Sequence, residues 1–211
     1  HHHPNPTLVG ACRYCPPRYH VAKESGEPYV SQECNHAKVG SIVARWHLLG
    51  DWWARQVADE VFNNALTLEY ADMAGWRQAR GNGHRLRILW FAAHLTGEAK
   101  YRQRAEQLMR LGAEHVQKNK EFDKRAKQRF MVGIALEGMI HHYRDRADPA
   151  VLRAVQSTAD LAYTEQDLKG YTANMAMAFG FCWQQSGNPI YIQALERIIR
   201  ATGPVGSAKI F

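Results

Sequence analysis

Four turn signals recur along the chain at similar intervals. Glycine suits the left-handed position that closes one helix, and Asp, Asn or Pro suits the start of the next helix, so each signal predicts a tight helix-to-helix corner. Gly50 and Gly97 lie 47 positions apart, a spacing in the range of helical-hairpin repeats. The four signals are Leu49-Gly50-Asp51, Thr96-Gly97-Glu98, Ala147-Asp148-Pro149 and Ser186-Gly187-Asn188-Pro189.

The segments before and after each corner differ in their apolar pattern. After each corner, apolar residues recur every three or four positions, which predicts outer helices with one buried face, as in Ala54, Val57, Ala58 and Val61. The segments before the corners are apolar nearly all round and must be covered on every side, so they predict an inner layer. These inner segments are residues 39–49, 86–95, 130–140 and 175–183.

The predicted fold is therefore all-α, with antiparallel helical hairpins in two layers forming an (α/α)n toroid or partial toroid. Residues 1–34 are expected to be an irregular N-terminal loop segment or short strands, because five prolines forbid long helices there. Residues 35–211 are expected to form the hairpin domain of about four hairpins. With 45% hydrophobic and 22% charged residues, the composition is that of a globular protein.

Charge and hydropathy narrow the class of partner. A formal charge of +7 predicts attraction to polyanions, but acidic residues are interleaved with the most basic stretch and no nucleic-acid-binding module accompanies it. No uncharged apolar run of eighteen residues occurs. We therefore expect a polyanion as partner, and neither nucleic acid nor a membrane.

Two corners carry a family resemblance. Ala-His-Leu-Thr-Gly-Glu at 93–98 and Trp-His-Leu-Leu-Gly-Asp at 46–51 look like two copies of one element and resemble the hairpins of α/α-toroid carbohydrate enzymes. The lead-in Ser-Gln-Glu-Cys-Asn-His at 31–36 resembles the toroid domain of exo-acting rhamnogalacturonan lyase-like proteins. The resemblance implies that the partner is an acidic polysaccharide or oligosaccharide, which is cleaved in a secreted or periplasmic setting. Complete toroids of this kind have more hairpins than the four counted here, which leaves room for other domains of the same protein.

Polar residues recur at the start of the inner helices. Aligned by their corners, His36, His84 and Asn174 occupy the same place, the expected rim of a toroid. Cleavage beside a uronate by β-elimination needs a cation or amide for the carboxylate, a base and an acid. The lyase resemblance assigns Arg80 and Asn82 to the carboxylate, His36 or His84 to the base and Tyr19 to the acid. Further substrate-binding candidates around this rim are Asn35, Trp76, Arg77 and Asn174.

Structural roles and other functions are alternative interpretations of these residues. A histidine at a helix start often only caps it, and the Arg80–His84 segment, expected as a loop whose glycines let a ligand approach, could be just a turn. Glycoside hydrolysis would need two opposed carboxylates, for which Glu33, Asp72 and Asp123 are the only acids near the rim. A non-catalytic helical scaffold is the remaining alternative.

The cysteines suggest a separate hypothesis. Cys12 and Cys15 form a CxxC, and Cys34 follows with His20 or His36 as the fourth soft ligand, a set that zinc accepts. A disulfide to Cys34 and free thiols remain open, and zinc is the only cofactor considered. Cys182 is expected to be a buried small hydrophobe, and His141-His142 a partly exposed pair near a helix end.

Overall fold

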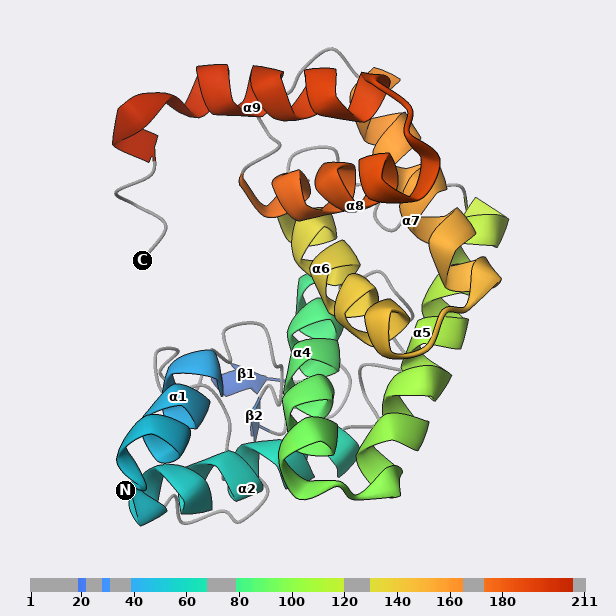
Figure 1. Ribbon diagram of the computed structural model, residues 1–211. Coiled ribbons are helices and arrows are strands. Elements are labelled where there is room, and N and C mark those ends of the chain that lie inside the picture. Colours follow the sequence, from blue (N-terminus) through green and yellow to red (C-terminus); the bar gives the residue numbers. More distant parts are fainter. Residues whose placement is uncertain are drawn as a thin grey trace.

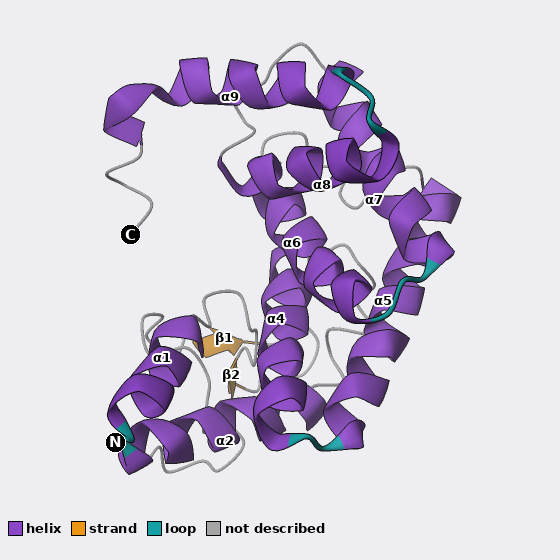
Figure 2. Ribbon diagram, in the orientation of Figure 1, coloured by secondary structure: helices purple, strands orange, loops and turns teal. Residues whose placement is uncertain are grey.

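The computed structural model describes residues 19–21, 28–30, 39–67, 79–119, 130–164 and 173–206. Nearly all of this is helical (Figures 1 and 2). Two short strands, β1 and β2, pair antiparallel near the N-terminus. The elements are β1 (Tyr19–Val21), β2 (Pro28–Val30), α1 (Val39–Leu49), α2 (Trp52–Thr67), α4 (Ala79–Thr96), α5 (Ala99–Asn119), α6 (Phe130–Asp145), α7 (Pro149–Thr164), η6 (Ala173–Met175), α8 (Ala176–Ser186) and α9 (Ile190–Gly206).

The predicted corners are confirmed. α1 and α2, α4 and α5, α6 and α7, and α8 and α9 form four antiparallel hairpins, each joined by two or three residues. Gly50, Gly97 and Gly187 all adopt positive φ, between 63° and 71°, which is the left-handed conformation that closes a helix. In the corner without glycine, the backbone amide of Arg146 donates to the carbonyl of His142, 3.1 Å away.

The hairpins follow one another around an open arc (Figure 1). α4 and α6 lie on its inner side, with α5 and α7 outside them, and α5 packs along α7. The inner helices α4 and α6 run in the same direction, because Gly83 approaches Ile134, Trp90 contacts His141 and His94 contacts Asp145. The starts of α4 and α6 therefore lie at the same end of this layer, as the two-layer prediction requires.

Three glycines let the inner helices touch through their backbones. A Cβ at Gly83 would lie 2.3 Å from the carbonyl oxygen of Ile134, and one at Gly138 would lie 2.6 Å from the carbonyl oxygen of Gly83. A Cβ at Gly133 would lie 2.7 Å from the backbone of Asn174 in η6. No side chain fits at these crossings, so the glycines fix how closely α4, α6 and η6 approach.

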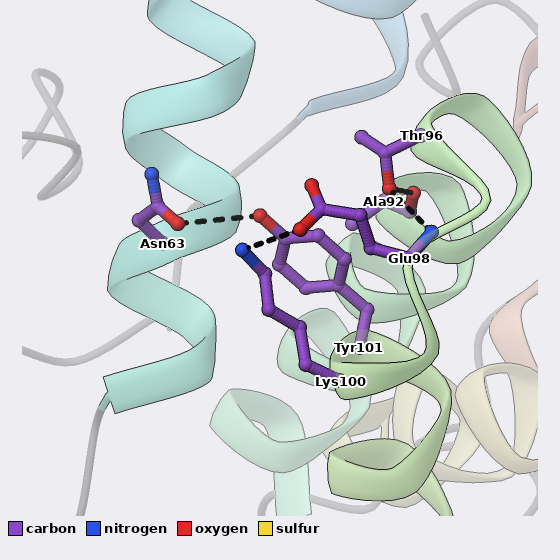
Figure 3. A network of polar contacts seen from close by, with 6 residues as sticks. All are labelled: Asn63, Ala92, Thr96, Glu98, Lys100 and Tyr101. Atoms are coloured by element: carbon purple, nitrogen blue, oxygen red, sulfur yellow. Dashed lines mark hydrogen bonds and ion pairs between the residues drawn. The ribbon is translucent and has the colours of Figure 1, made fainter.

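Polar contacts join each hairpin to the next. Arg85, fully buried on α4, donates from Nε to the carbonyl of Ala65 at 2.6 Å and so satisfies the C-terminal end of α2. Figure 3 shows Tyr101 of α5 reaching back to α2, where its hydroxyl donates to Asn63 Oδ1 at 3.2 Å. Further along, the Tyr191 hydroxyl donates to Asp160 at 2.7 Å, which links α9 to α7.

The first inner segment departs from its prediction. Residues 39–49 were expected to be covered on every side, yet only Val39 and Val43 of α1 are buried, and Leu48 and Leu49 are exposed. α1 lies at one end of the arc and packs against α2. The described chain has no earlier hairpin whose inner helix would cover the other side of α1, so that side stays exposed. Among the described helices, none is both long and apolar enough to cross a bilayer.

Candidate functional site

The predicted rim residues on α4 belong to its first turns. Arg80, Asn82 and His84 were expected on a loop, but α4 begins at Ala79, so this segment is helical. Gly83 is needed for the approach of α6 and not for that of a ligand, which corrects the sequence interpretation. Asn82 and His84 are buried, with 1% and 9% of their area exposed, and Arg80 is half-buried.

The structure brings part of the predicted rim to one end of the inner layer. Gly83, next to His84, packs on Ile134, and the preceding Gly133 packs on Asn174. The starts of α4, α6 and η6 therefore adjoin, as the corner alignment predicted for His84 and Asn174. For Tyr19 and His20 the structure gives only the backbone of β1. The other candidates lie outside the described residues: Cys12, Cys15, Cys34, Asn35, His36, Trp76 and Arg77.

A second polar cluster, which the sequence interpretation missed, follows the side-by-side helices α4 and α6. We call it the α4–α6 stripe, and it consists of Arg87, Trp90 and His94 on α4 with Glu137, His141 and Asp145 on α6. Spacings of three and four place each set on one face of its helix. Between 22% and 38% of the area of each of the five ionisable side chains is exposed, so a ligand in solution can reach them.

The stripe contains two imidazole–carboxylate pairs. His94 Nε2 lies 3.3 Å from Asp145 Oδ1, and His141 Nε2 lies 3.8 Å from Glu137 Oε1. Nδ1 of His94 lies 2.9 Å from the backbone carbonyl of Trp90, and since a carbonyl only accepts, Nδ1 carries the proton when this bond forms. Such a pair orients an imidazole, which is what a general base or acid requires.

Trp90 separates the two imidazoles. Its ring centroid is 4.3 Å from that of His94 and 4.9 Å from that of His141, and both rings are tilted against it. The indole Nε1 is buried, and no hydrogen-bond partner for it occurs in the part of the chain that the structure describes. Trp90 therefore fixes the positions of the two histidines more than it offers a free face to a sugar.

Glu137 is held in its ionised form. Burial opposes ionisation, but the hydrogen bond with His141 and the charges of Arg87, His141 and His84 outweigh it and keep the pKa of Glu137 below its usual value. Arg87 Nη1 lies 3.4 Å from the same Oε1 that faces His141. The Glu137 carboxylate thus links a cation and an imidazole. His84, at the buried rim, also contributes to lowering the pKa of Glu137.

Two features of the sequence could have revealed the stripe. Glu137 is the only acidic residue in the otherwise apolar segment 130–140, and a charge there is costly unless it is paired. Arg87 and His94 interrupt the apolar run at 86–95, and Trp90 lies between them at helical spacing. Sequence reasoning sought the site at the helix starts, and it treated His141 only as one of a pair near a helix end.

No metal centre is formed by the residues that the structure places. Groups of three or more His, Cys, Asp or Glu side chains in metal-binding geometry do not occur among them. The predicted zinc ligands fall in the undescribed N-terminal region, apart from the backbone of His20. Cys182 is buried on α8, and burial raises the pKa of its thiol to about 12, as suits the expected small hydrophobe.

Comparison with known proteins gives no relative for this arrangement: no protein-family model, no curated protein and no solved structure matches the chain.

Proposed function

We propose that the chain binds an acidic, uronate-containing polysaccharide along the α4–α6 stripe and cleaves it by β-elimination. The observation that carries this proposal is the pair of imidazole–carboxylate dyads flanking Trp90, beside Arg87. The overall charge of +7 favours approach of a polyanion. The corner motifs that resemble α/α-toroid carbohydrate enzymes support the same substrate class.

The stripe offers the three groups that elimination needs. Arg87 neutralises the uronate carboxylate, which lowers the cost of removing the neighbouring proton. His141, oriented by Glu137, is the base, and His94, oriented by Asp145, protonates the leaving oxygen. We assign these roles to the stripe because Asn82 and His84 are too buried to contact a polymer, and His84 acts instead through Glu137.

The polar end of the inner layer completes the proposed binding site. Arg80 and Asn174 are half-buried at the starts of α4 and η6, so they retain a surface for a sugar hydroxyl or carboxylate. The N-termini of the parallel helices α4 and α6 lie at the same end, and their partial positive charges add to that of Arg80. A polyanion would therefore lie from this end toward the corners, across the stripe.

Single substitutions test the assignment. We expect His141→Ala and Arg87→Ala each to lower the rate of unsaturated-product formation from a uronate polysaccharide about a hundredfold or more. The ultraviolet absorbance of the unsaturated product measures this rate. Matched controls are His47→Ala and Arg102→Ala, which remove an exposed histidine and an exposed arginine outside the stripe and should leave the rate unchanged.

A non-catalytic glycan-binding scaffold is the second candidate. It is favoured by the fact that Arg87, Glu137 and His141 already pair with one another, as side chains that only link two helices would. This candidate predicts retention on an immobilised acidic polysaccharide without product after long incubation. Normal helical circular dichroism together with that result would reject the lyase proposal.

A further inference from the structure

Among the residues that the structure describes, exposed large apolar side chains occur only on the first and last hairpins. Of those in the described chain, Trp183 and Ile199 lie on α8 and α9, and the others gather at the α1–α2 corner. The middle hairpins, α4 to α7, contribute none among their described side chains. The corner cluster, which we call the apolar corner, consists of Leu48, Leu49, Trp52 and Trp53, exposed by 81%, 73%, 55% and 63%.

The equivalent corners are polar, which shows that the fold does not require this cluster. At the second corner the Thr96 hydroxyl donates to the carbonyl of Ala92 and accepts the amide of Glu98, as Figure 3 shows. At the fourth corner Ser186 makes the same two contacts with Cys182 and Asn188. The first corner has Leu49 in that position, so it replaces a capping hydroxyl with an exposed leucine.

The two tryptophans differ from their equivalents as well. Aligned by the corner glycines, Trp52 corresponds to Ala99 and Trp53 to Lys100, which pairs with Glu98 in Figure 3. Trp52 and Trp53 instead stack on each other, with ring centroids 4.4 Å apart. Exposing this much apolar area costs solubility, so its concentration at one corner indicates an interaction surface.

The size and position of the corner argue against a second copy of the chain as the partner. Given ~150–250 Å² for a large side chain, the cluster exposes on the order of 500 Å², below the ~800 Å² per partner of a stable protein interface. Figure 1 shows the corner at an extremity of the arc, where the chain turns. A small projecting tip of this kind suits insertion into a fluid phase better than a shape-matched interface.

The chemistry of the corner fits the interfacial region of a bilayer. Tryptophan concentrates there because its ring is apolar and its N–H is polar, and leucine enters the acyl region beneath. Beside the corner, Arg45 pairs with Asp51 and Arg55 pairs with Asp59, so these four charges balance. The attraction to anionic headgroups comes from the whole chain, which carries +7. Both arginines lie on exposed faces of their helices.

We propose that the apolar corner inserts into the interface of an anionic membrane and holds the protein there peripherally. The sequence-based expectation excluded a membrane partner because no segment could span one, and this proposal requires none to do so. The anchored corner lies on the first hairpin, while the α4–α6 stripe lies on the second and third. Membrane binding therefore does not depend on the proposed catalysis.

Vesicle flotation tests the proposal. The wild-type chain should float with vesicles of equal parts phosphatidylcholine and phosphatidylglycerol, and less with phosphatidylcholine alone. The triple variant Leu49→Thr, Trp52→Ala, Trp53→Lys copies the second corner and should lower the partition coefficient about tenfold or more. Because the variant adds a positive charge, this loss would isolate insertion from charge attraction.

A control variant and a fluorescence measurement complete the test. Trp183→Ala removes an exposed tryptophan far from the corner in sequence and should leave flotation unchanged; an equal loss would overturn the proposal. Acyl chains brominated near the headgroup should quench wild-type tryptophan fluorescence, a readout that needs no variant. Failure to float, absence of quenching, or dimers that the triple variant dissociates would each reject a membrane partner.

Discussion

The first hairpin and the α4–α6 pair begin from similar sequences and end in different surroundings. α1 and α6 are both apolar segments that precede a corner, yet α6 is almost wholly buried and α1 is mostly exposed. α6 has glycine-mediated contacts with α4 on one side and η6 on the other, whereas a Cβ added at Gly40 of α1 would meet nothing within 4 Å. Apolar composition thus marks a helix for burial, but only neighbours on both sides achieve it.

Substituting the crossing glycine should produce the largest effect. In Gly83→Ala the new Cβ would meet the backbone of Ile134, which cannot move without shifting α6, so we expect a loss of at least about 3 kcal/mol of unfolding free energy. Urea denaturation measures it. The matched substitution Gly40→Ala enters open space on α1 and should change stability by only about 0.5–1 kcal/mol, toward greater stability. Equal effects at both glycines would abolish the distinction between the two regions.

Acid should weaken the α4–α6 pair through His142. This histidine is buried and donates from Nε2 to the carbonyl of Leu86 at 2.8 Å, and burial lowers its pKa from 6.5 to about 4. Between pH 6.5 and about pH 4, His142 is protonated in the unfolded chain and neutral in the folded chain. Stability should therefore be unaffected above about pH 6.5, fall as pH drops toward 4, and lose about 3 kcal/mol in all.

The variant His142→Leu isolates this contribution. It fills the same buried site without a titratable group, so its stability should fall less over that range than the stability of the wild-type chain. Thermal unfolding at a series of pH values makes the comparison. A wild-type profile parallel to that of the variant would show that His142 does not titrate in this window.

Corner capping should produce the smallest effect. Thr96→Ala removes the hydroxyl that bonds both Ala92 and Glu98, and we expect it to cost about 1 kcal/mol. Leu49→Thr introduces the same group at the first corner and should gain a few tenths of a kcal/mol. Differential scanning calorimetry can resolve the pair. A Leu49→Thr variant that is clearly less stable would mean that Leu49 contributes packing that its exposure does not show.

The hairpin plan could be derived from sequence because its signals are local. Three corners need a residue in the left-handed conformation, and glycine, which adopts it most easily, occupies that position at Gly50, Gly97 and Gly187. The apolar composition of segments 86–95 and 130–140 likewise predicted that they are buried. What failed depended on neighbours far away in sequence: the exposure of Leu48, the burial of His142, and the packing role of Gly83 against Ile134.

The candidate site was less predictable for the same reason. Arg87 and Glu137 are fifty positions apart, and only the parallel course of α4 and α6 brings them within 3.4 Å. Aligning the repeats by their corners put His84 and Asn174 at the starts of inner helices, and the starts of α4, α6 and η6 adjoin in the structure. It could not reveal that His84 is buried, or that polar side chains on two helices meet midway along their length.

The contacts that join successive hairpins also bear on how the protein unfolds. Arg85 ties α4 to the end of α2, Tyr101 binds Asn63, and Tyr191 binds Asp160, so each of these ties reaches only the adjoining repeat. In such linear arrays, opening can begin at an end and advance one unit at a time. Amide hydrogens in α1 and α9 should therefore exchange with solvent earliest, and those of α4 and α6 last.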